Sequence, residues 1–229
     1  MQIKDLLILI PCRKGSKGIK NKNILKIKNK MLYEFSLDHA RIVQKKYSSS
    51  IIAITSNYSK ILNKKYKNIF LIKRPNKISK DRSKSSEYVA HALNHFNKKS
   101  IKFKSIMVLQ PTCPIRTKKD LLNSVKLFKS KKEKSLITAY EETYINKKVL
   151  YLKKKSYGYP LSTLHNLGSQ RQENRSCYVR NGSIYITEEK FFTNFKKIIS
   201  KKPIIYVMSK LNSINIDTKN DLEILKKII

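Results

Sequence analysis

The chain has 229 residues, of which 40% are hydrophobic, and this length suits a single α/β domain over residues 1–229 with a substantial core. No apolar run reaches the roughly 20 residues of a membrane-spanning helix, and the three cysteines form no CxxC pair. We therefore expect a cytoplasmic protein without membrane contact, disulfides or a zinc knuckle. The formal net charge of +36 comes mostly from lysines scattered over every segment, which is typical of a solvated surface. We expect no specific nucleic-acid partner, and a basic nucleic-acid-binding protein remains the alternative from another class.

Apolar runs that predict strands alternate with helical patterns over the first 140 residues. Strands are expected at 5–10, 51–56, 69–72, 105–110 and 135–140, and helices at about 32–46, 58–66, 86–97 and 118–131. This βαβα order indicates a parallel sheet with helices on both faces. Ligands of such sheets bind at the carboxyl ends of the strands.

The regular pattern stops at about residue 141 and returns near residue 180. A segment of this length inside a compact domain is typical of a lid, a binding loop or an oligomer arm, and it includes a strand-like stretch at 149–152. A strand at 183–187, a helix at 188–197, a strand at 203–208 and a final helix at 219–228 are expected after it. No linker is long enough to separate independent domains.

The segment after the first predicted strand combines glycines with cations. Two of the five glycines, Gly15 and Gly18, lie here, together with five polar side chains: Arg13, Ser16, Lys17, Lys22 and Asn23. Glycine lets a backbone approach a ligand closely, and a cationic loop at a strand end suits polyphosphate. The loop has neither the Walker A nor the dinucleotide glycine pattern. Its cations suit a nucleoside triphosphate attacked at the α-phosphate, and the alternative is an ordinary basic turn.

Three later segments also carry candidate site residues. Residues 74–86 suit a base-recognition loop, or a polar loop with Ser85 or Ser86 as N-cap. Two prolines after Gln110 fix a turn that points this side chain into the cleft, or that simply satisfies backbone groups. A short strand at 215–217 would put Asn215 and Asp217 on one face, where they could hold Mg²⁺. Otherwise Asp217 only helps to start the last helix.

Taken together, these segments resemble the cytidylyltransferases that activate nine-carbon 2-keto sugar acids, the CMP-sialic acid synthetase family. The resemblance runs in order over nearly the whole chain, through 13–23, 74–85, 109–116, 171–172, 181–185 and 216–222. It implies a Rossmann-like α/β fold whose inserted arm at 141–180 helps to form a homodimer and to bind the sugar. It also implies CTP and a sugar acid as substrates, Mg²⁺ as cofactor, and attack of the anomeric hydroxyl on the α-phosphate with release of pyrophosphate.

The resemblance further assigns roles by position. The triphosphate and ribose would be held by Arg13, Ser16, Lys17, Lys22 and Asn23. Cytosine would be read by Arg74 and Ser85. The sugar acid would face Gln110, Arg171, Asn181 and Tyr185, with Lys147 or Lys148 reaching it from the arm. Asp217 would bind the metal, with Asn215 as a second, uncharged ligand. We expect the catalytic groups to be Lys17, Arg13 and Asp217, with Lys17 as the main electrostatic group in the transition state.

Departures from the family pattern bear on the substrate. Asn215 stands where many members have aspartate, and Cys12 and Cys113 replace small residues, with little expected effect. Arg180, directly before Asn181, looks more like the legionaminate-activating branch, and 198–199 is Ile-Ile where sialate enzymes often have an aromatic pair. The sequence therefore predicts transfer of CMP to N-acetylneuraminate or legionaminate for surface glycans. Pseudaminate and the eight-carbon Kdo are the alternative acceptors.

Overall fold

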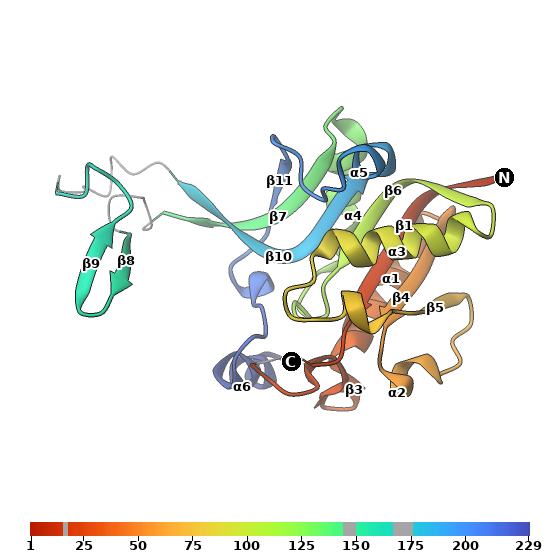
Figure 1. Cartoon of the computed structure of the whole chain (residues 1–229), viewed down its shortest axis with the longest axis horizontal. Helices are drawn as coiled ribbons and strands as arrows, with labels where there is room; N and C mark the ends of the chain where they lie inside the picture. The colour runs from red at the N-terminus through yellow and green to blue at the C-terminus, as the bar shows by residue number, and fades with distance from the viewer. Residues whose placement is uncertain (16–17, 144–149, 167–175) are drawn as a thin grey trace.

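The computed structural model describes residues 1–15, 18–143, 150–166 and 176–229. Its centre is a seven-stranded sheet with the order β11-β7-β10-β6-β1-β4-β5 (Figure 1). These strands are β1 Gln2–Cys12, β4 Ser50–Ser56, β5 Ile69–Lys73, β6 Ile101–Leu109, β7 Ser135–Glu142, β10 Cys177–Glu188 and β11 Ile204–Val207. Every pairing is parallel except those of β10, which runs antiparallel to β6 and β7. The strands expected at 5–10, 51–56, 69–72, 105–110, 135–140, 183–187 and 203–208 are all present in this sheet.

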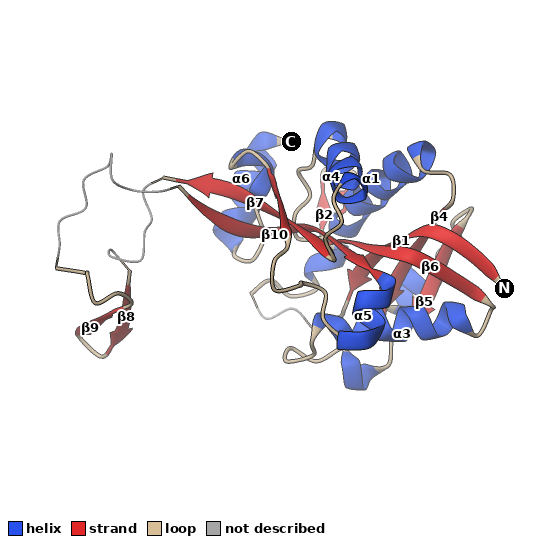
Figure 2. Cartoon of the chain, turned by 90° about the horizontal axis from the view of Figure 1, so that it is seen from above, coloured by secondary structure: helices blue, strands red, loops and turns tan. Residues whose placement is uncertain are grey.

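Helices cover both faces of the sheet, which confirms the predicted Rossmann-like arrangement (Figure 2). They are α1 Leu32–Lys46, α2 Ser59–Leu62, α3 Ser85–Asn97, α4 Lys118–Ser130, α5 Glu189–Phe195 and α6 Lys219–Ile228. Along β1, Ile8 packs into the core under α1 and α4, whereas Leu7 and Leu9 pack under α3 and α5. A strand buried on both faces is therefore apolar without interruption.

Two predicted elements are wrong in extent or type. The helix expected at 58–66 ends at Leu62, because the chain turns back toward α1. There Lys64 pairs with Glu34 at 2.7 Å and the Tyr66 hydroxyl lies 2.6 Å from that of Tyr33. Residues 215–217 form no strand. Ile216 is instead buried in an irregular segment whose N–H donates to the carbonyl of Thr112 at 2.7 Å.

The segment between β7 and β10 carries a separate antiparallel hairpin, set apart from the main sheet in Figure 1. Its strands are β8 Tyr151–Lys154 and β9 Tyr157–Pro160. The strand-like stretch was expected at 149–152, but β8 begins at Tyr151, and residue 149 lies outside the described residues. Large apolar side chains of this hairpin are exposed, among them Leu152 and Tyr157 at 61% and 71%.

Side-chain caps fix where two helices begin. The Thr117 hydroxyl accepts from the Asp120 N–H at 3.0 Å at the start of α4, and Thr218 accepts from Asp221 at 3.2 Å at the start of α6. In both helices the T-x-x-D spacing in the sequence is the pattern of a capping box. Two short strands, β2 Lys26–Ile27 and β3 Lys30–Met31, lie between the first loop and α1. None of the helices within the described residues combines the length and hydrophobicity that crossing a bilayer requires.

Candidate active site

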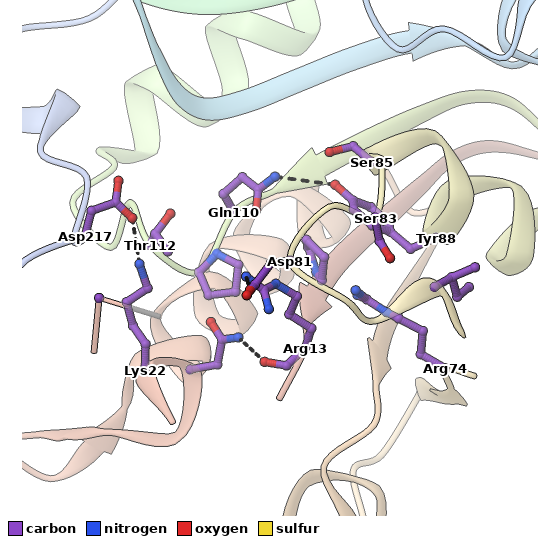
Figure 3. Close-up of a pocket in the computed structure, with 15 residues that line it drawn as sticks. Arg13, Lys22, Arg74, Asp81, Ser83, Ser85, Tyr88, Gln110, Thr112 and Asp217 are labelled. Carbon is purple, nitrogen blue, oxygen red and sulfur yellow. Dashed lines mark hydrogen bonds and ion pairs between the residues drawn. The ribbon is translucent and has the colours of Figure 1, made fainter. Parts of the chain in front are cut away.

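A cleft of about 590 Å³ opens at the carboxyl ends of β1, β5 and β6. Figure 3 shows side chains from the first loop, from residues 74–88, from the turn after β6 and from the segment before α6 meeting around it. Seven residues singled out from the sequence line it: Arg13, Lys22, Asn23, Arg74, Ser85, Gln110 and Asp217. Residues separated by up to about 200 positions in the chain are therefore brought together where the parallel sheet predicts a ligand.

The first loop is attached to the segment before α6. Lys22 is buried, and its ammonium donates to Asp217 Oδ1 at 2.7 Å and to the carbonyl of Ile216. Gly18 lies against the same segment, since a Cβ there would stand 2.2 Å from the carbonyl oxygen of Asp217. Asn23 braces the loop from within, because its amide donates to the carbonyl of Arg13 at 3.0 Å. Groups expected to bind phosphate and the expected metal ligand thus meet at one junction.

Arg13 connects the first loop with the other wall of the cleft. Its guanidinium donates to the carbonyl of Gly15 at 2.8 Å and pairs with Asp81 at 2.7 Å. Both side chains of this ion pair are about one-third exposed, so its contribution to stability is small. A phosphate group entering the cleft can compete for Arg13 at little cost.

Arg74 forms a fixed wall of the cleft. It is 3% exposed, donates to the hydroxyl and the carbonyl of Thr55 at 3.2 and 3.0 Å, and stacks 4.8 Å above the ring of Tyr88. Burial lowers the pKa of its guanidinium. Ser85, one helical turn before Tyr88, faces the same cleft. These groups present a planar cation and a hydroxyl, which suits recognition of a heterocyclic base.

A second cavity of about 150 Å³ adjoins the cleft. Ser85, Tyr88 and Gln110 line both spaces, and the smaller one adds Arg180, Tyr185, Ile198 and Ile199. The Gln110 amide lies 3.4 Å from the Tyr88 hydroxyl and so stands at the junction. The site therefore consists of two adjoining compartments: a large one lined by cations and a small one whose wall is partly aliphatic.

Asn181 is not placed in either cavity, although the sequence suggested that it faces the sugar acid. Its side chain is buried between β10 and the segment that follows β11. The amide oxygen accepts from the Thr138 hydroxyl at 2.6 Å and from the Ser183 N–H at 3.0 Å, and the amide nitrogen donates to Ser213 at 2.8 Å. The side chain of Asn181 thus bonds to groups inside the protein, so the expectation that it faces the sugar acid is corrected.

Asn215 and Asp217, the pair expected to bind a metal, lie on a loop rather than on a strand, and Asp217 lines the cleft. The Asn215 amide nitrogen donates to Asp217 Oδ2, and its oxygen accepts from the Cys113 thiol. No group of three or more acidic, histidine or cysteine side chains within the described residues could enclose a metal. Mg²⁺ commonly binds through one or two carboxylates together with substrate phosphates, so the exposed carboxylate of Asp217 fits such an ion, with Asn215 orienting it.

Four polar residues of the cleft had no individual role predicted from the sequence: Asp81, Ser83, Tyr88 and Thr112. Tyr88 could have been found from its i, i+3 spacing to Ser85, which places the two on one helix face. Asp81 is an acid within a basic segment, and Thr112 follows the proline that fixes the turn. Ser16, Lys17, Lys147, Lys148 and Arg171, which were assigned to phosphate or sugar, lie outside the described residues.

Comparisons with known proteins agree with this arrangement. A family model described as cytidylyltransferase matches residues 7–228. The chain is 26% identical to the N-acylneuraminate cytidylyltransferase of Escherichia coli O18:K1:H7 over 96% of this chain and 51% of that protein, and therefore spans about half its length. It is also 26% identical to the CMP-N,N'-diacetyllegionaminic acid synthase of Campylobacter jejuni, over 98% of this chain and 95% of that one. The fold is similar to that of the 2-C-methyl-D-erythritol 4-phosphate cytidylyltransferase of Francisella tularensis, with a TM-score of 0.63, 16% identity and coverage of 98% and 100%.

Proposed function

The chain belongs to the cytidylyltransferase family, and we propose that it transfers CMP from CTP to the anomeric hydroxyl of a nine-carbon 2-keto sugar acid. The observation that carries the proposal is the cleft itself. It joins a cationic glycine loop to a buried arginine wall, and it opens into a second compartment at Gln110. A cytoplasmic location follows for an enzyme that consumes CTP, and we include it in the proposal.

The donor compartment supplies charge where phosphoryl transfer needs it. Arg13 and Lys22 line the cleft and would neutralise phosphate oxygens as the bond from the anomeric oxygen to the α-phosphorus forms. The bond from the α-phosphorus to the oxygen that bridges it to the β-phosphorus breaks, pyrophosphate leaves with the electron pair, and the attacking hydroxyl gives its proton to water. Mg²⁺ held at Asp217 would add Lewis-acid stabilisation. Lys17 is proposed as the main cation of the transition state.

The acceptor compartment favours legionaminate or N-acetylneuraminate. Arg180 can attract an anionic sugar, and Tyr185 and Gln110 offer hydrogen-bonding groups. Ile198 and Ile199 give an aliphatic wall in place of aromatic rings, which favours the legionaminate type. The similarity to the CMP-N,N'-diacetyllegionaminic acid synthase of Campylobacter jejuni supports this choice. Pseudaminate is the alternative acceptor within the same reaction.

We also propose a homodimer formed through the hairpin arm. Leu152, Tyr157 and Tyr159 are at least half exposed on a two-stranded hairpin that packs little of its own surface. A two-stranded hairpin is marginal in water, and clustered exposed apolar side chains mark interaction surfaces. A second copy of the chain is the occupant that the family resemblance implies.

Pyrophosphate release from CTP, measured against N-acetylneuraminate, legionaminate, pseudaminate and Kdo, tests the function. We expect turnover with CTP above ATP, GTP and UTP, and with a nine-carbon acid above Kdo. Lys17→Met should lower kcat far more than it raises KM for CTP. Lys14→Met, an exposed cation of the same loop, is the matched control. If no sugar acid releases pyrophosphate with CTP, the enzyme assignment fails. RNA binding that survives ~200 mM salt would then favour the nucleic-acid alternative.

A further inference from the structure

Arg116 lies behind the turn that carries Gln110, with 5% of its surface exposed. A guanidinium has five N–H donors, and each of them has an acceptor here. Nε donates to the Ser183 hydroxyl at 2.9 Å, and Nη1 to the Ser36 hydroxyl at 3.2 Å and His39 Nδ1 at 3.3 Å. Nη2 donates to the carbonyls of Gln110 at 2.6 Å and Ser183 at 2.9 Å. All five N–H groups of the guanidinium thus donate to uncharged acceptors.

The charge of Arg116 has no carboxylate partner in the part of the chain that the structure describes, since none of the ion pairs there includes it. Burial lowers the pKa of Arg116 to about 10, so it stays charged at neutral pH. Burial, together with the Arg116 charge, lowers the pKa of His39 to about 3, which keeps that ring neutral. Burying a cation without a carboxylate partner is unfavourable, and the five hydrogen bonds leave the positive charge of Arg116 unbalanced.

The acceptors of Arg116 tie two walls of the small cavity together. The Ser183 carbonyl also accepts from the N–H of Gln110 at 3.4 Å, which links the end of β6 to β10. The pairing of β10 with β7 shifts register between Arg180 and Tyr185, and Gly182 there has a φ of +75°. Such a bulge leaves residues without ladder partners. Arg116 supplies hydrogen bonds at this point and holds Gln110 beside the strand that carries Tyr185.

We propose that Arg116 is a positioning residue for the acceptor compartment, which fixes Gln110 against β10 and whose unbalanced charge favours the anionic acceptor. The role rests on the proposed cytidylyl transfer. Electrostatic attraction through the protein interior is screened less than through water, so a buried cation behind the wall acts on a carboxylate bound in front of it. CTP contacts the other compartment and depends on this residue less.

Two substitutions separate the hydrogen bonds from the charge. Arg116→Met removes both, and we expect KM for the sugar acid to rise roughly tenfold or more while KM for CTP stays within about twofold. Arg116→Lys restores the charge but not the five-donor fork, and we expect it to recover part of the acceptor KM. A loss of melting temperature alone, with both KM values unchanged, overturns the proposal, and so does an equal rise in the two KM values.

A third variant covers the case in which Arg116 substitutions do not fold. Ser183→Ala removes the Nε acceptor and leaves the charge in place, and acceptor KM should rise by roughly threefold. Ser124→Ala is the matched control, because Ser124 is equally buried and bonds only within α4, to Leu121 at 2.9 Å. Equal acceptor KM values in these two variants contradict the positioning role. Absence of turnover in the unmodified protein refutes the proposed function instead, and the two failures are therefore distinct.

Discussion

Replacing Gly18 by alanine tests whether the first loop and the Asp217 segment act as one unit. An alanine Cβ at position 18 would stand 2.2 Å from the carbonyl oxygen of Asp217, and real Cβ contacts are not found below 3.0 Å. The two segments must therefore separate by at least about 0.8 Å. Both sides of the contact are backbone, so no side-chain rotation relieves it. The required movement lies directly between the phosphate loop and the expected metal ligand.

The magnitude follows from this separation. Overpacking of this kind costs about 1–3 kcal/mol of stability, and a displacement near 1 Å at a reacting site costs on the order of 100-fold in rate. The ion pair from Lys22 to Asp217, now 2.7 Å long, should lengthen with it. We expect kcat/KM to fall by one to two orders of magnitude, with a larger loss at low Mg²⁺.

Steady-state pyrophosphate release at several Mg²⁺ concentrations, with a melting curve for each variant, measures these effects. Gly15→Ala is the comparison, because Gly15 lies in the same loop with a φ of +88° and no atom within 4 Å of the added Cβ. That change strains the backbone by about 1–2 kcal/mol without a collision. The argument would be refuted if the activity of Gly18→Ala stayed within twofold of that of the unmodified protein. It would also be refuted if the loss of activity were the same at every Mg²⁺ concentration.

Three further substitutions probe the metal ligand, the base wall and the arm. Asn215→Asp adds a carboxylate beside Asp217, and should lower the Mg²⁺ concentration for half-maximal rate on the order of tenfold; an unchanged Mg²⁺ titration contradicts this. Arg74→Lys loses the paired bonds to Thr55 and the stacking on a ring, so KM for CTP should rise roughly tenfold, and equal KM values in a CTP titration argue against base recognition. Tyr157→Lys, at an exposed apolar position of the hairpin, should shift the mass measured by light scattering from dimer to monomer.

Local signals in the sequence were sufficient for most of the fold. Uninterrupted apolar runs identified β1 and β4 because both strands are buried on both faces. The T-x-x-D pairs identified the starts of α4 and α6 because a cap depends on residues three apart. The end of α2 could not be predicted, since it depends on contacts of Lys64 and Tyr66 with α1, about 30 residues away.

The site was predictable where it follows strand ends, and less so where it depends on long-range contacts. Alternation on a strand was the wrong reason to pair Asn215 with Asp217, yet the two side chains do meet in a loop. Asn181 was assigned to the sugar, whereas its partners Thr138 and Ser213 come from segments that only the folded chain brings together. Arg116 ends a segment that carries the family resemblance, but no role could be predicted for it, because its acceptors lie in α1, in β10 and in the turn after β6.

The ion pairs across the cleft explain how a site with many cations can remain folded and still accept the proposed triphosphate. Lys22 pairs with Asp217 and Arg13 pairs with Asp81, so an acid holds each of these two cations that line the cleft. Asp217 is 61% exposed and Asp81 33% exposed, and exposed pairs contribute little free energy. A phosphate oxygen can therefore replace either acid as partner at small cost, while the buried ammonium of Lys22 keeps its bond to the carbonyl of Ile216. The same exchange releases the carboxylate of Asp217, which ties donor binding to the availability of the expected metal ligand.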